Sequence, residues 1–188
     1  MRIIAGRFKG KPIMFLKSLN TRPLKDSVKE SIFNIVTHSK LVDVVLNNSK
    51  ILDLYSGIGS FGLEALSRGA RKVTFIERNK DAINILKKNI NNLSVQNNVE
   101  LFSAEINNVL ESKKIDKFDI LFMDPPFADK SYIETIKLIK KKRILNKDNL
   151  VIIHREKKTV DNLNNILNIF LTKTYNRSKI LFARLSAQ

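Results

Sequence analysis

The stretch of residues 50–66 constrains the possible folds of this chain more than any other segment. It opens with the apolar run Ile51-Leu52-Asp53-Leu54, passes through glycines at positions 57, 59 and 62, and ends in an apolar, helix-forming sequence. This order predicts a buried strand, a tight turn and a helix. The glycines would let the backbone approach a ligand where a side chain would collide. Asp53 lies near the carboxyl end of the predicted strand, where open α/β sheets bind their ligands.

Strands and helices alternate along the rest of the chain, which predicts an α/β fold with a mainly parallel sheet. Helices are expected after Pro23, after an N-cap at Asn79, and over 132–141, where Ser131 and Glu134 form a capping-box pattern. Seven strands are expected, at 51–54, 73–76, 99–102, 118–123, 150–153, 166–174 and 178–185. The last two would form a hairpin that adds an antiparallel edge to the sheet.

Residues 1–45 read as a small β and helical extension on the substrate side, before a core over 46–188, and we expect one domain over 1–188. Residues 1–20 carry basic side chains and no acid, and their short apolar pieces favour a packed hairpin or arm over a solvated tail. From Thr21-Arg22-Pro23 on, apolar residues recur at helical spacing. This pattern predicts an outer helix face that carries Lys25, Lys29 and Glu30.

The chain is strongly basic: 34 Lys and Arg residues stand against 18 Asp and Glu, a net charge of +16. Such an excess favours a polyanionic partner, most often a nucleic acid. The alternative is compositional drift, because the chain is also rich in Lys, Asn and Ile, as in proteins from A+T-biased genomes. We favour a functional basic face.

Several classes of protein are excluded by what the sequence lacks. Cysteine is absent, which rules out a disulfide scaffold, thiol catalysis and cysteine metal sites. His38 and His154 are too few for a histidine-rich cluster, so no metal is expected. The N-terminus meets glycine and charge too early for a signal peptide, and no apolar run approaches the roughly 18 residues that span a membrane. We expect a cytoplasmic protein without a membrane partner.

The glycine motif Gly57-x-Gly59-x-x-Gly62 is followed by an acid, Glu77, at the end of the second predicted strand. This spacing is typical of nucleoside-binding sheets, in which the carboxylate accepts hydrogen bonds from the ribose hydroxyls. Taken alone, it also fits a nicotinamide-dependent enzyme. The alternative role for Glu77 is that of an acid at a helix N-terminus, where the macrodipole favours negative charge.

Asp124-Pro125-Pro126-Phe127 directly follows a buried strand and distinguishes between these possibilities. The two prolines stiffen the backbone and remove two N–H donors. A carboxylate, carbonyl acceptors and an aromatic ring remain, which suit a planar ring that bears an amino group. The alternative is a proline-stiffened turn whose phenylalanine belongs to the core.

Residues 52–59 and Asp124-Pro125-Pro126-Phe127 together resemble class I S-adenosylmethionine-dependent amino-methyltransferases, a Rossmann-like fold family. The opening residues 2–6, Thr21-Arg22-Pro23 and residues 62–70 narrow the resemblance to the small bacterial 16S ribosomal RNA guanine-N2-methyltransferases. It covers nearly the whole chain. This chain departs from the family pattern at Lys29-Glu30, where Arg-Glu is usual, and in the glycine turn.

The resemblance implies a reaction, a cofactor, a partner and a set of site residues. The enzyme would transfer a methyl group from S-adenosylmethionine to the exocyclic N2 of one guanine in 16S ribosomal RNA, within the small ribosomal subunit, and would act as a monomer. The residues implied in cofactor binding are Asp53, Tyr55, Ser56, Gly57, Gly59, Glu77, Arg78, Glu105 and Asp124. Those implied in catalysis are Asp124, Pro125, Pro126 and Phe127. Those implied in RNA binding are Arg2, Arg7, Lys9, Lys11 and Arg22.

Other aromatic and histidine side chains have less specific roles. The rings of Tyr55, Phe61 and Phe102 are expected in the core. His154 ends the fifth strand and can line the pocket, but we favour a structural role for it. Three other functions remain open from the sequence: a DNA adenine-N6 methyltransferase, a nicotinamide-dependent oxidoreductase and a non-catalytic RNA-binding protein on the same fold.

Overall fold

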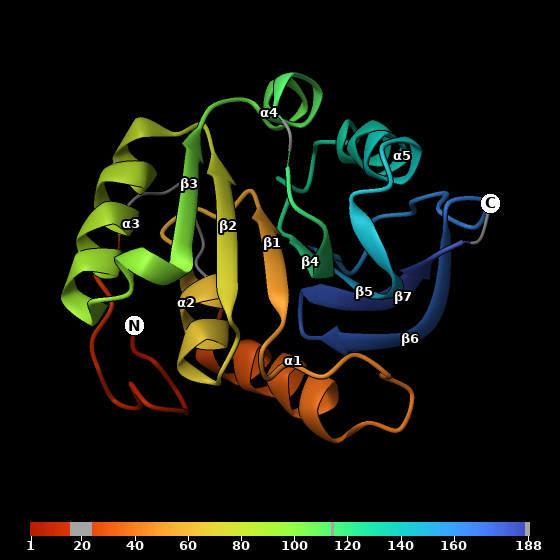
Figure 1. The fold of residues 1–188 in the computed structure, drawn as a ribbon. Helices are drawn as coiled ribbons and strands as arrows, with labels where there is room; N and C mark the ends of the chain where they lie inside the picture. The colour runs from red at the N-terminus through yellow and green to blue at the C-terminus, as the bar shows by residue number, and fades with distance from the viewer. Residues whose placement is uncertain (16–23, 114, 187–188) are drawn as a thin grey trace.

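The computed structural model describes residues 1–15, 24–113 and 115–186. Its middle layer is a seven-stranded sheet of order β3-β2-β1-β4-β5-β7-β6 (Figure 1). The strands are β1 Lys50–Leu54, β2 Lys72–Glu77, β3 Val99–Ser103, β4 Phe118–Met123, β5 Leu145–Glu156, β6 Leu167–Tyr175 and β7 Ser178–Leu185. β1 to β5 pair in parallel, and β7 pairs antiparallel with β5 and β6. The predicted α/β fold with an antiparallel C-terminal hairpin is confirmed.

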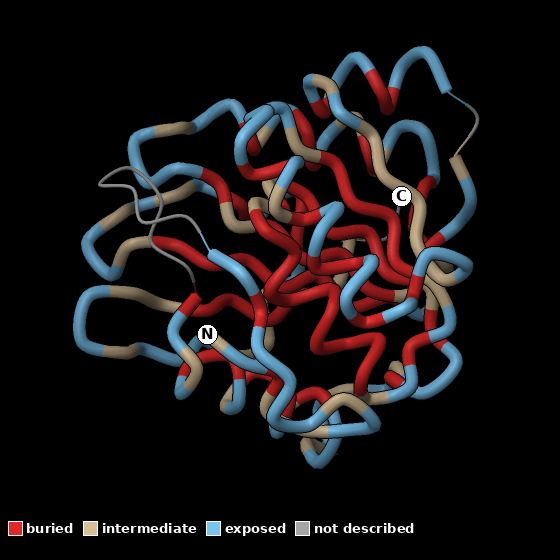
Figure 2. Tube along the Cα trace, turned by 90° about the vertical axis from the view of Figure 1, so that its left-hand side faces the viewer, coloured by how far each residue is buried: buried red, intermediate tan, exposed pale blue. Residues whose placement is uncertain are grey.

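Helices cover both faces of the sheet. They are α1 Asp26–His38, α2 Ser60–Ser67, α3 Lys80–Leu93, α4 Ile106–Ser112 and α5 Tyr132–Lys141, with a short 3₁₀ turn η1 Gln96–Asn98. α1, α2 and α3 share one apolar core with the sheet face that carries Ile51 and Phe122. α4 and α5 share a second core with the face that carries Leu52 and Leu121. The buried trace accordingly runs through the middle of the molecule (Figure 2).

The strand order reverses between β1 and β4, and open α/β sheets bind their ligands at the carboxyl ends of the strands at such a point. From β1 the sheet grows through β2 to β3, and from β4 it grows through β5 to the hairpin. Leu54, the last residue of β1, pairs with Met123, the last residue of β4. The glycine turn and the Asp-Pro-Pro-Phe loop therefore leave the sheet side by side.

Local structure differs from the sequence expectation at several points. β5 is much longer than 150–153, and α4 was not predicted. α5 begins at Tyr132 as expected, yet Ser131 makes no capping hydrogen bond from its side chain, so the predicted capping box is wrong. Asn79 does cap α3, because its side chain accepts from Ala82 N. The expected helix start at Thr21-Arg22-Pro23 lies outside the described residues. Within the described ranges no helix is long and apolar enough to cross a membrane.

The N-terminal residues fold back on themselves and dock on α2. Arg2 and Pro12 form an antiparallel bridge, and Ile3 N donates to Lys11 O at 3.0 Å. The carboxylate of Glu64 in α2 accepts from the backbone N–H groups of Ile4 and Ala5, at 2.8 and 3.0 Å. The expectation of a packed hairpin over these residues is confirmed as far as the described part extends.

Lys29 is buried, although the sequence placed it on the outer face of α1. Its Nζ lies 3.5 Å from Oε2 of Glu64, and it also donates to Arg2 O at 3.1 Å. Burial lowers the pKa of Lys29, and the nearby Glu64 carboxylate opposes that shift. The helical spacing of the apolar residues around Lys29 does not predict its burial, because its partner, Glu64, lies on another helix.

Candidate active site

Asp53 is held inside the sheet and braces the helix that follows the glycine turn. Its side chain is buried, and Oδ2 accepts from Gly62 N at 3.0 Å. Among the described residues, no hydrogen-bond donor reaches Oδ1. Burial raises the pKa of Asp53 well above its usual range; the Gly62 N–H opposes this shift, and the carboxylates of Asp124 and Glu77 add to it. Asp53 therefore lies close enough to the carboxyl groups of Asp124 and Glu77 to interact with both electrostatically.

The glycines serve two different purposes, which corrects the expectation that each makes room for a ligand. A Cβ on Gly59 would lie 2.3 Å from Leu86 Cδ1, and one on Gly62 would lie 2.4 Å from Phe75 Cε1. Both positions are therefore closed by the chain's own core. A Cβ on Gly57 would meet nothing within 4 Å, so of these three glycines it is Gly57 that borders open space.

The backbone of the glycine turn is strained at a non-glycine residue. Tyr55 has a φ of 56°, in the left-handed region. An L side chain adopts this conformation at a cost of roughly 1–2 kcal/mol. Strain of this kind concentrates at functional sites, where the surrounding fold enforces it. The ring of Tyr55 packs against the second core, as does Phe102, and Phe61 is buried between Phe33 and Phe122. The expected core role is confirmed for Phe61, whereas Tyr55 and Phe102 are only partly buried at the border of the core.

Glu77 ties the end of β2 to two neighbouring segments. Its Oε2 accepts from Gly57 N at 2.8 Å, and its Oε1 accepts from Arg78 N and Asn79 N at 2.9 and 2.8 Å. A carboxylate offers roughly four acceptor positions. Three backbone N–H groups already donate to the Glu77 carboxylate, so ribose hydroxyls would have to use its remaining acceptor positions. The alternative role, an acid at the start of α3, is present in the structure, and the ribose role stays a prediction.

Arg78 and Glu105 join the loops that follow β2 and β3. Nη1 of Arg78 lies 2.9 Å from Oε1 of Glu105, and both side chains are exposed. Glu105 immediately precedes α4. Two of the predicted cofactor residues are thus brought together at the outer side of the turn, next to Glu77.

Asp124 follows β4 and points its carboxylate into the site. Its N–H donates to Leu54 O at 3.4 Å, and its Oδ1 lies 2.8 Å from Nδ1 of His154. Among the described residues, nothing pairs with Oδ2. Phe127 is 39% exposed, which contradicts the alternative of a core phenylalanine. Its ring meets the His154 ring edge-on, with centroids 5.8 Å apart.

Two residues beside Asp124 were not assigned to the site from the sequence. For His154, lining the pocket was the less favoured alternative, and in the structure it contacts the carboxylate of Asp124. Arg155, at 1% exposure, donates to the carbonyls of Pro126 and Phe127, a role that no sequence pattern assigned to it. The available signal was a pair of polar residues at the end of the apolar strand 150–153, an uncommon place for an arginine unless it has a buried partner.

The geometry fits S-adenosylmethionine, the expected cofactor. Its sulfonium is a cation, and Asp53 lies within electrostatic reach of both Asp124 and Glu77. Gly57 borders open space while its N–H donates to Glu77 Oε2. The buried Ser56 Oγ, like Asp53 Oδ1, has no partner in the described part of the chain. In that same part, no group of His, Asp or Glu side chains could hold a metal ion.

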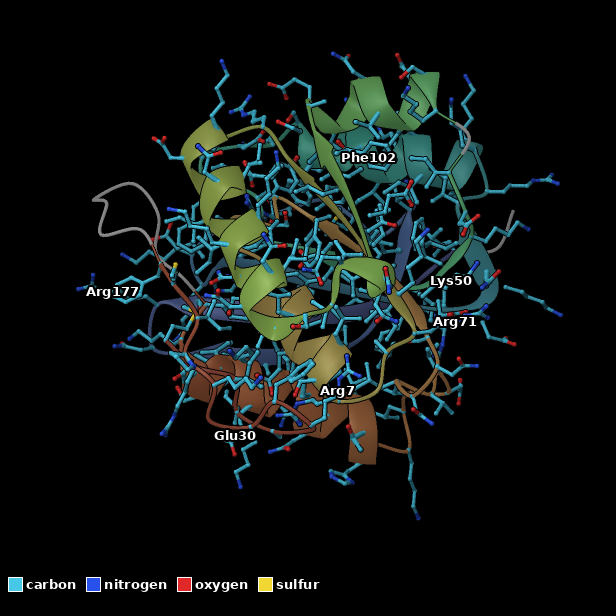
Figure 3. The ribbon with its side chains drawn as sticks, turned by 60° about the vertical axis from the view of Figure 1, so that its left-hand side comes forward. Arg7, Glu30, Lys50, Arg71, Phe102 and Arg177 are labelled. Atoms are coloured by element: carbon cyan, nitrogen blue, oxygen red, sulfur yellow. The ribbon has the colours of Figure 1, made fainter. Side chains whose placement is uncertain are left out.

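The predicted RNA-binding residues lie apart from this site. Arg2, Arg7, Lys9 and Lys11 are all exposed, and Arg22 lies outside the described residues. Arg7 N donates to the carbonyl of Ser67, the last residue of α2, at 2.8 Å. The glycine turn lies at the opposite end of this helix, just before its first residue. Figure 3 shows Arg7 and Phe102, which lies at the carboxyl edge of the sheet, at opposite ends of the view. The structure does not bring this basic arm together with Asp124.

The sequence matches a known family over nearly its whole length. The family model Conserved hypothetical protein 95 matches residues 1–184. The ribosomal RNA small subunit methyltransferase D of Buchnera aphidicola is 33% identical over 156 residues, which cover 83% of this chain and 78% of that protein. The protein of the same name in Haemophilus influenzae is 35% identical, covering 84% of this chain and 79% of that protein.

Solved structures agree with this relationship. The yhhF protein of Escherichia coli superposes with a TM-score of 0.85 at 26% identity, over 100% of this chain and 99% of that one. A Haemophilus influenzae protein superposes with a TM-score of 0.76 at 31% identity, over 98% of both chains. The shared architecture is the class I methyltransferase fold. The chain described above belongs to the Conserved hypothetical protein 95 family, together with the ribosomal RNA small subunit methyltransferases D.

Proposed function

We propose that this protein methylates the exocyclic N2 of a guanine in 16S ribosomal RNA, within the assembled or assembling small subunit. The observation that carries the proposal is Asp124. Its carboxylate is fixed at Oδ1 by His154, keeps Oδ2 for a donor, and stands beside the exposed ring of Phe127 at the strand switch point. A planar base that presents an amino group suits this arrangement. The family relationship supports the same conclusion.

The cofactor is S-adenosylmethionine, which supplies an electrophilic methyl group when bound. Asp53, Ser56 and the backbone at Gly57 and Gly59 would face its methionine portion, and Tyr55 shapes the turn. Glu77 and Arg78 would hold the ribose side, and Glu105 would lie toward adenine. The neighbouring carboxyl groups of Asp53, Glu77 and Asp124 would favour a cation between them, and so would attract a cationic cofactor.

Asp124 would prepare the guanine amine for attack. The lone pair of this nitrogen is delocalised into the ring, so the amine is a weak nucleophile. Hydrogen bonds from its N–H groups to Asp124 Oδ2 and the Pro125 carbonyl would favour a pyramidal nitrogen and stabilise the positive charge that develops on it. Phe127 would stack on the base. A paired base would have to leave its helix first, at a cost of a few kcal/mol.

The basic surface would hold the RNA backbone at a distance from the reacting base. A ribosomal subunit is far larger than this chain, so contacts at Arg7 and Lys9, beyond the far end of α2, are compatible with a base at Asp124. Phosphate contacts position a nucleic acid without reading its sequence. Selection of one guanine would then depend on the shape of the folded RNA around it.

Nucleoside mass spectrometry tests this proposal. Small subunits from cells that lack the enzyme would be incubated with the pure protein and labelled cofactor, and the RNA digested. N2-methylguanosine is the expected product. N6-methyladenosine would overturn the assigned base while keeping the methyl-transfer mechanism, and naked DNA as the only labelled substrate would establish a DNA adenine-N6 methyltransferase instead. Protein-free 16S RNA, tested in parallel, shows whether the assembled subunit is needed.

A further inference from the structure

Two consecutive side chains at the carboxyl end of β5 contact the Asp124–Phe127 loop. His154 and Arg155 leave the strand toward opposite faces of the sheet, because successive residues in a strand alternate. Nδ1 of His154 lies 2.8 Å from Asp124 Oδ1. Nη1 and Nη2 of Arg155 donate to the carbonyls of Pro126 and Phe127, each at 3.1 Å. The loop is therefore held at its first, third and fourth residues.

The buried guanidinium of Arg155 has an oppositely charged partner, Asp161. Its Nε and Nη2 lie 3.2 and 3.3 Å from the carboxylate oxygens of Asp161. Its guanidinium carbon lies 4.6 Å from the ring centroid of Tyr132, the first residue of α5. Burial would raise the pKa of Asp161, but hydrogen bonds and charge from Arg155 bring it below its usual range. The ion pair thus fixes the guanidinium in one orientation, with its remaining donors directed at the loop.

The loop needs such support because of its own composition. Pro125 and Pro126 have no N–H group, so this segment cannot be held by donating hydrogen bonds at these residues. The loop therefore has to be fixed through its acceptors, the backbone carbonyls and the Asp124 carboxylate. Apart from Arg155, Asp129 N also donates to Pro126 O, at 2.9 Å. Two carbonyls are thereby turned inward, and Asp124 Oδ2 is left for substrate.

We propose that His154 and Arg155, the latter locked by Asp161, are positioning residues for methyl transfer. His154 fixes the rotation of the Asp124 carboxylate, and Arg155 fixes the backbone that carries Asp124 and Phe127. This inference rests on the proposed role of Asp124 as the acceptor of the amine. A loss of alignment of about 1 Å is enough to lower a rate by roughly 10²-fold.

The kinetic test uses His154→Asn, Arg155→Met and Asp161→Asn, with matched controls for the histidine and the arginine. His38→Asn and Arg177→Met remove an exposed histidine and an exposed arginine outside the site. The expected result is a fall in kcat of roughly 10²-fold for Arg155→Met, a smaller fall for the other two, and an unchanged KM for S-adenosylmethionine. Addition of guanidinium ion to Arg155→Ala should restore part of kcat. Values of kcat equal to those of the controls would overturn the proposal.

A second readout does not depend on the RNA substrate. The chain has no tryptophan, so Phe127→Trp installs a single reporter in the loop. Added to this reporter, Arg155→Met and Asp161→Asn should increase acrylamide quenching and lower the steady-state anisotropy, whereas Arg177→Met should change neither. If the loop signal responds but the wild-type protein fails to methylate ribosomal RNA, the proposed function fails and the positioning role stands. An unchanged signal in all variants contradicts the positioning role. Should Arg155→Met fail to fold, Asp161→Asn carries both tests and His154→Asn carries the kinetic one.

Discussion

Lys29 and Glu64 form an ion pair in the interior, with Nζ and Oε2 3.5 Å apart and both side chains fully buried. The pair joins α1 to α2, the helix that begins at the glycine turn. Glu64 also accepts from Ile4 N and Ala5 N and pairs with Arg68 Nε at 2.7 Å. One carboxylate thus fixes the N-terminal hairpin, α1 and the helix at the active site relative to one another.

Lys29→Met should strongly destabilise the protein. It leaves the Glu64 carboxylate buried with one cation fewer, and breaking a buried pair costs roughly 3–5 kcal/mol. Lys137→Ala is the control, because it breaks the exposed Glu134–Lys137 pair, for which at most about 1 kcal/mol is expected. Urea denaturation followed by circular dichroism gives both free energies of unfolding. Equal losses in the two variants would show that the Lys29 pair is weak.

Asp53→Asn should raise the stability of the free protein at neutral pH while weakening cofactor binding. Burial raises the pKa of Asp53. The folded state therefore binds the proton more tightly than the unfolded state, and stability falls as pH rises from the unfolded value of 3.8 through the folded pKa. Asn removes this loss and still accepts from Gly62 N. Thermal melts across pH should diverge most above the folded pKa of Asp53.

The exposed Asp148→Asn serves as the control for this experiment and should follow the wild-type melting curve. A stabilising effect of Asp53→Asn confined to acidic pH would contradict the predicted sign. Isothermal titration with S-adenosylmethionine measures the accompanying loss of affinity, which is expected because the variant removes negative charge from the site.

Gly57→Ala and Gly62→Ala should fail in different ways. The Cβ at position 62 would lie 2.4 Å from Phe75 Cε1, so this variant overpacks the core, at a cost of roughly 1–3 kcal/mol. The Cβ at position 57 would meet open space. The Gly57→Ala variant is therefore destabilised only by its left-handed backbone conformation, by roughly 1–2 kcal/mol, and should fold. Melting temperature and cofactor affinity, measured together, separate the two. Normal cofactor binding by Gly57→Ala would place the ligand elsewhere.

Asp124→Asn should bind cofactor almost normally but lose most of its activity. The carboxylate is partly exposed, and its loss removes an acceptor for the amine, whereas the backbone of the glycine turn is unaffected. Loss of one well-placed electrostatic interaction typically lowers kcat by roughly 10²–10³-fold. Single-turnover rates and cofactor titration are the measurements. Weak cofactor binding, rather than a slow reaction, would give Asp124 a structural role.

Arg7→Ala and Lys9→Ala should each weaken RNA binding at low salt and reduce the salt dependence of affinity. Removing one cationic side chain from a phosphate lowers the slope of log K against log salt by about one. Lys141→Ala, at the end of α5 on the other side of the sheet, is the matched control for a basic residue outside the arm. If all three variants lower RNA affinity equally, the overall positive charge of the protein, rather than a defined basic face, determines RNA binding.

The local parts of this protein follow from its amino-acid pattern alone. Residues 50–66 form a strand, a turn and a helix because each element is encoded by its own spacing of apolar residues and glycines. Asp124-Pro125-Pro126-Phe127 emerges from β4 for the same reason. Parallel pairing of alternating strands and helices then brings the two segments to one edge of the sheet. The fold and the two ends of the site could therefore be predicted without the structure.

Which side chains meet depends on the packing of the whole fold. Lys29 lies on a helix whose pattern shows an apolar stripe, and its burial depends on Glu64 of another helix and on the carbonyl of Arg2. His154 and Arg155 acquire their partners from a loop about 30 residues earlier in the chain. The docking of Arg7 at the far end of α2 likewise depends on contacts with residues some 60 positions away. Local spacing carries no record of such distant partners, because they are selected only when the elements pack together in three dimensions.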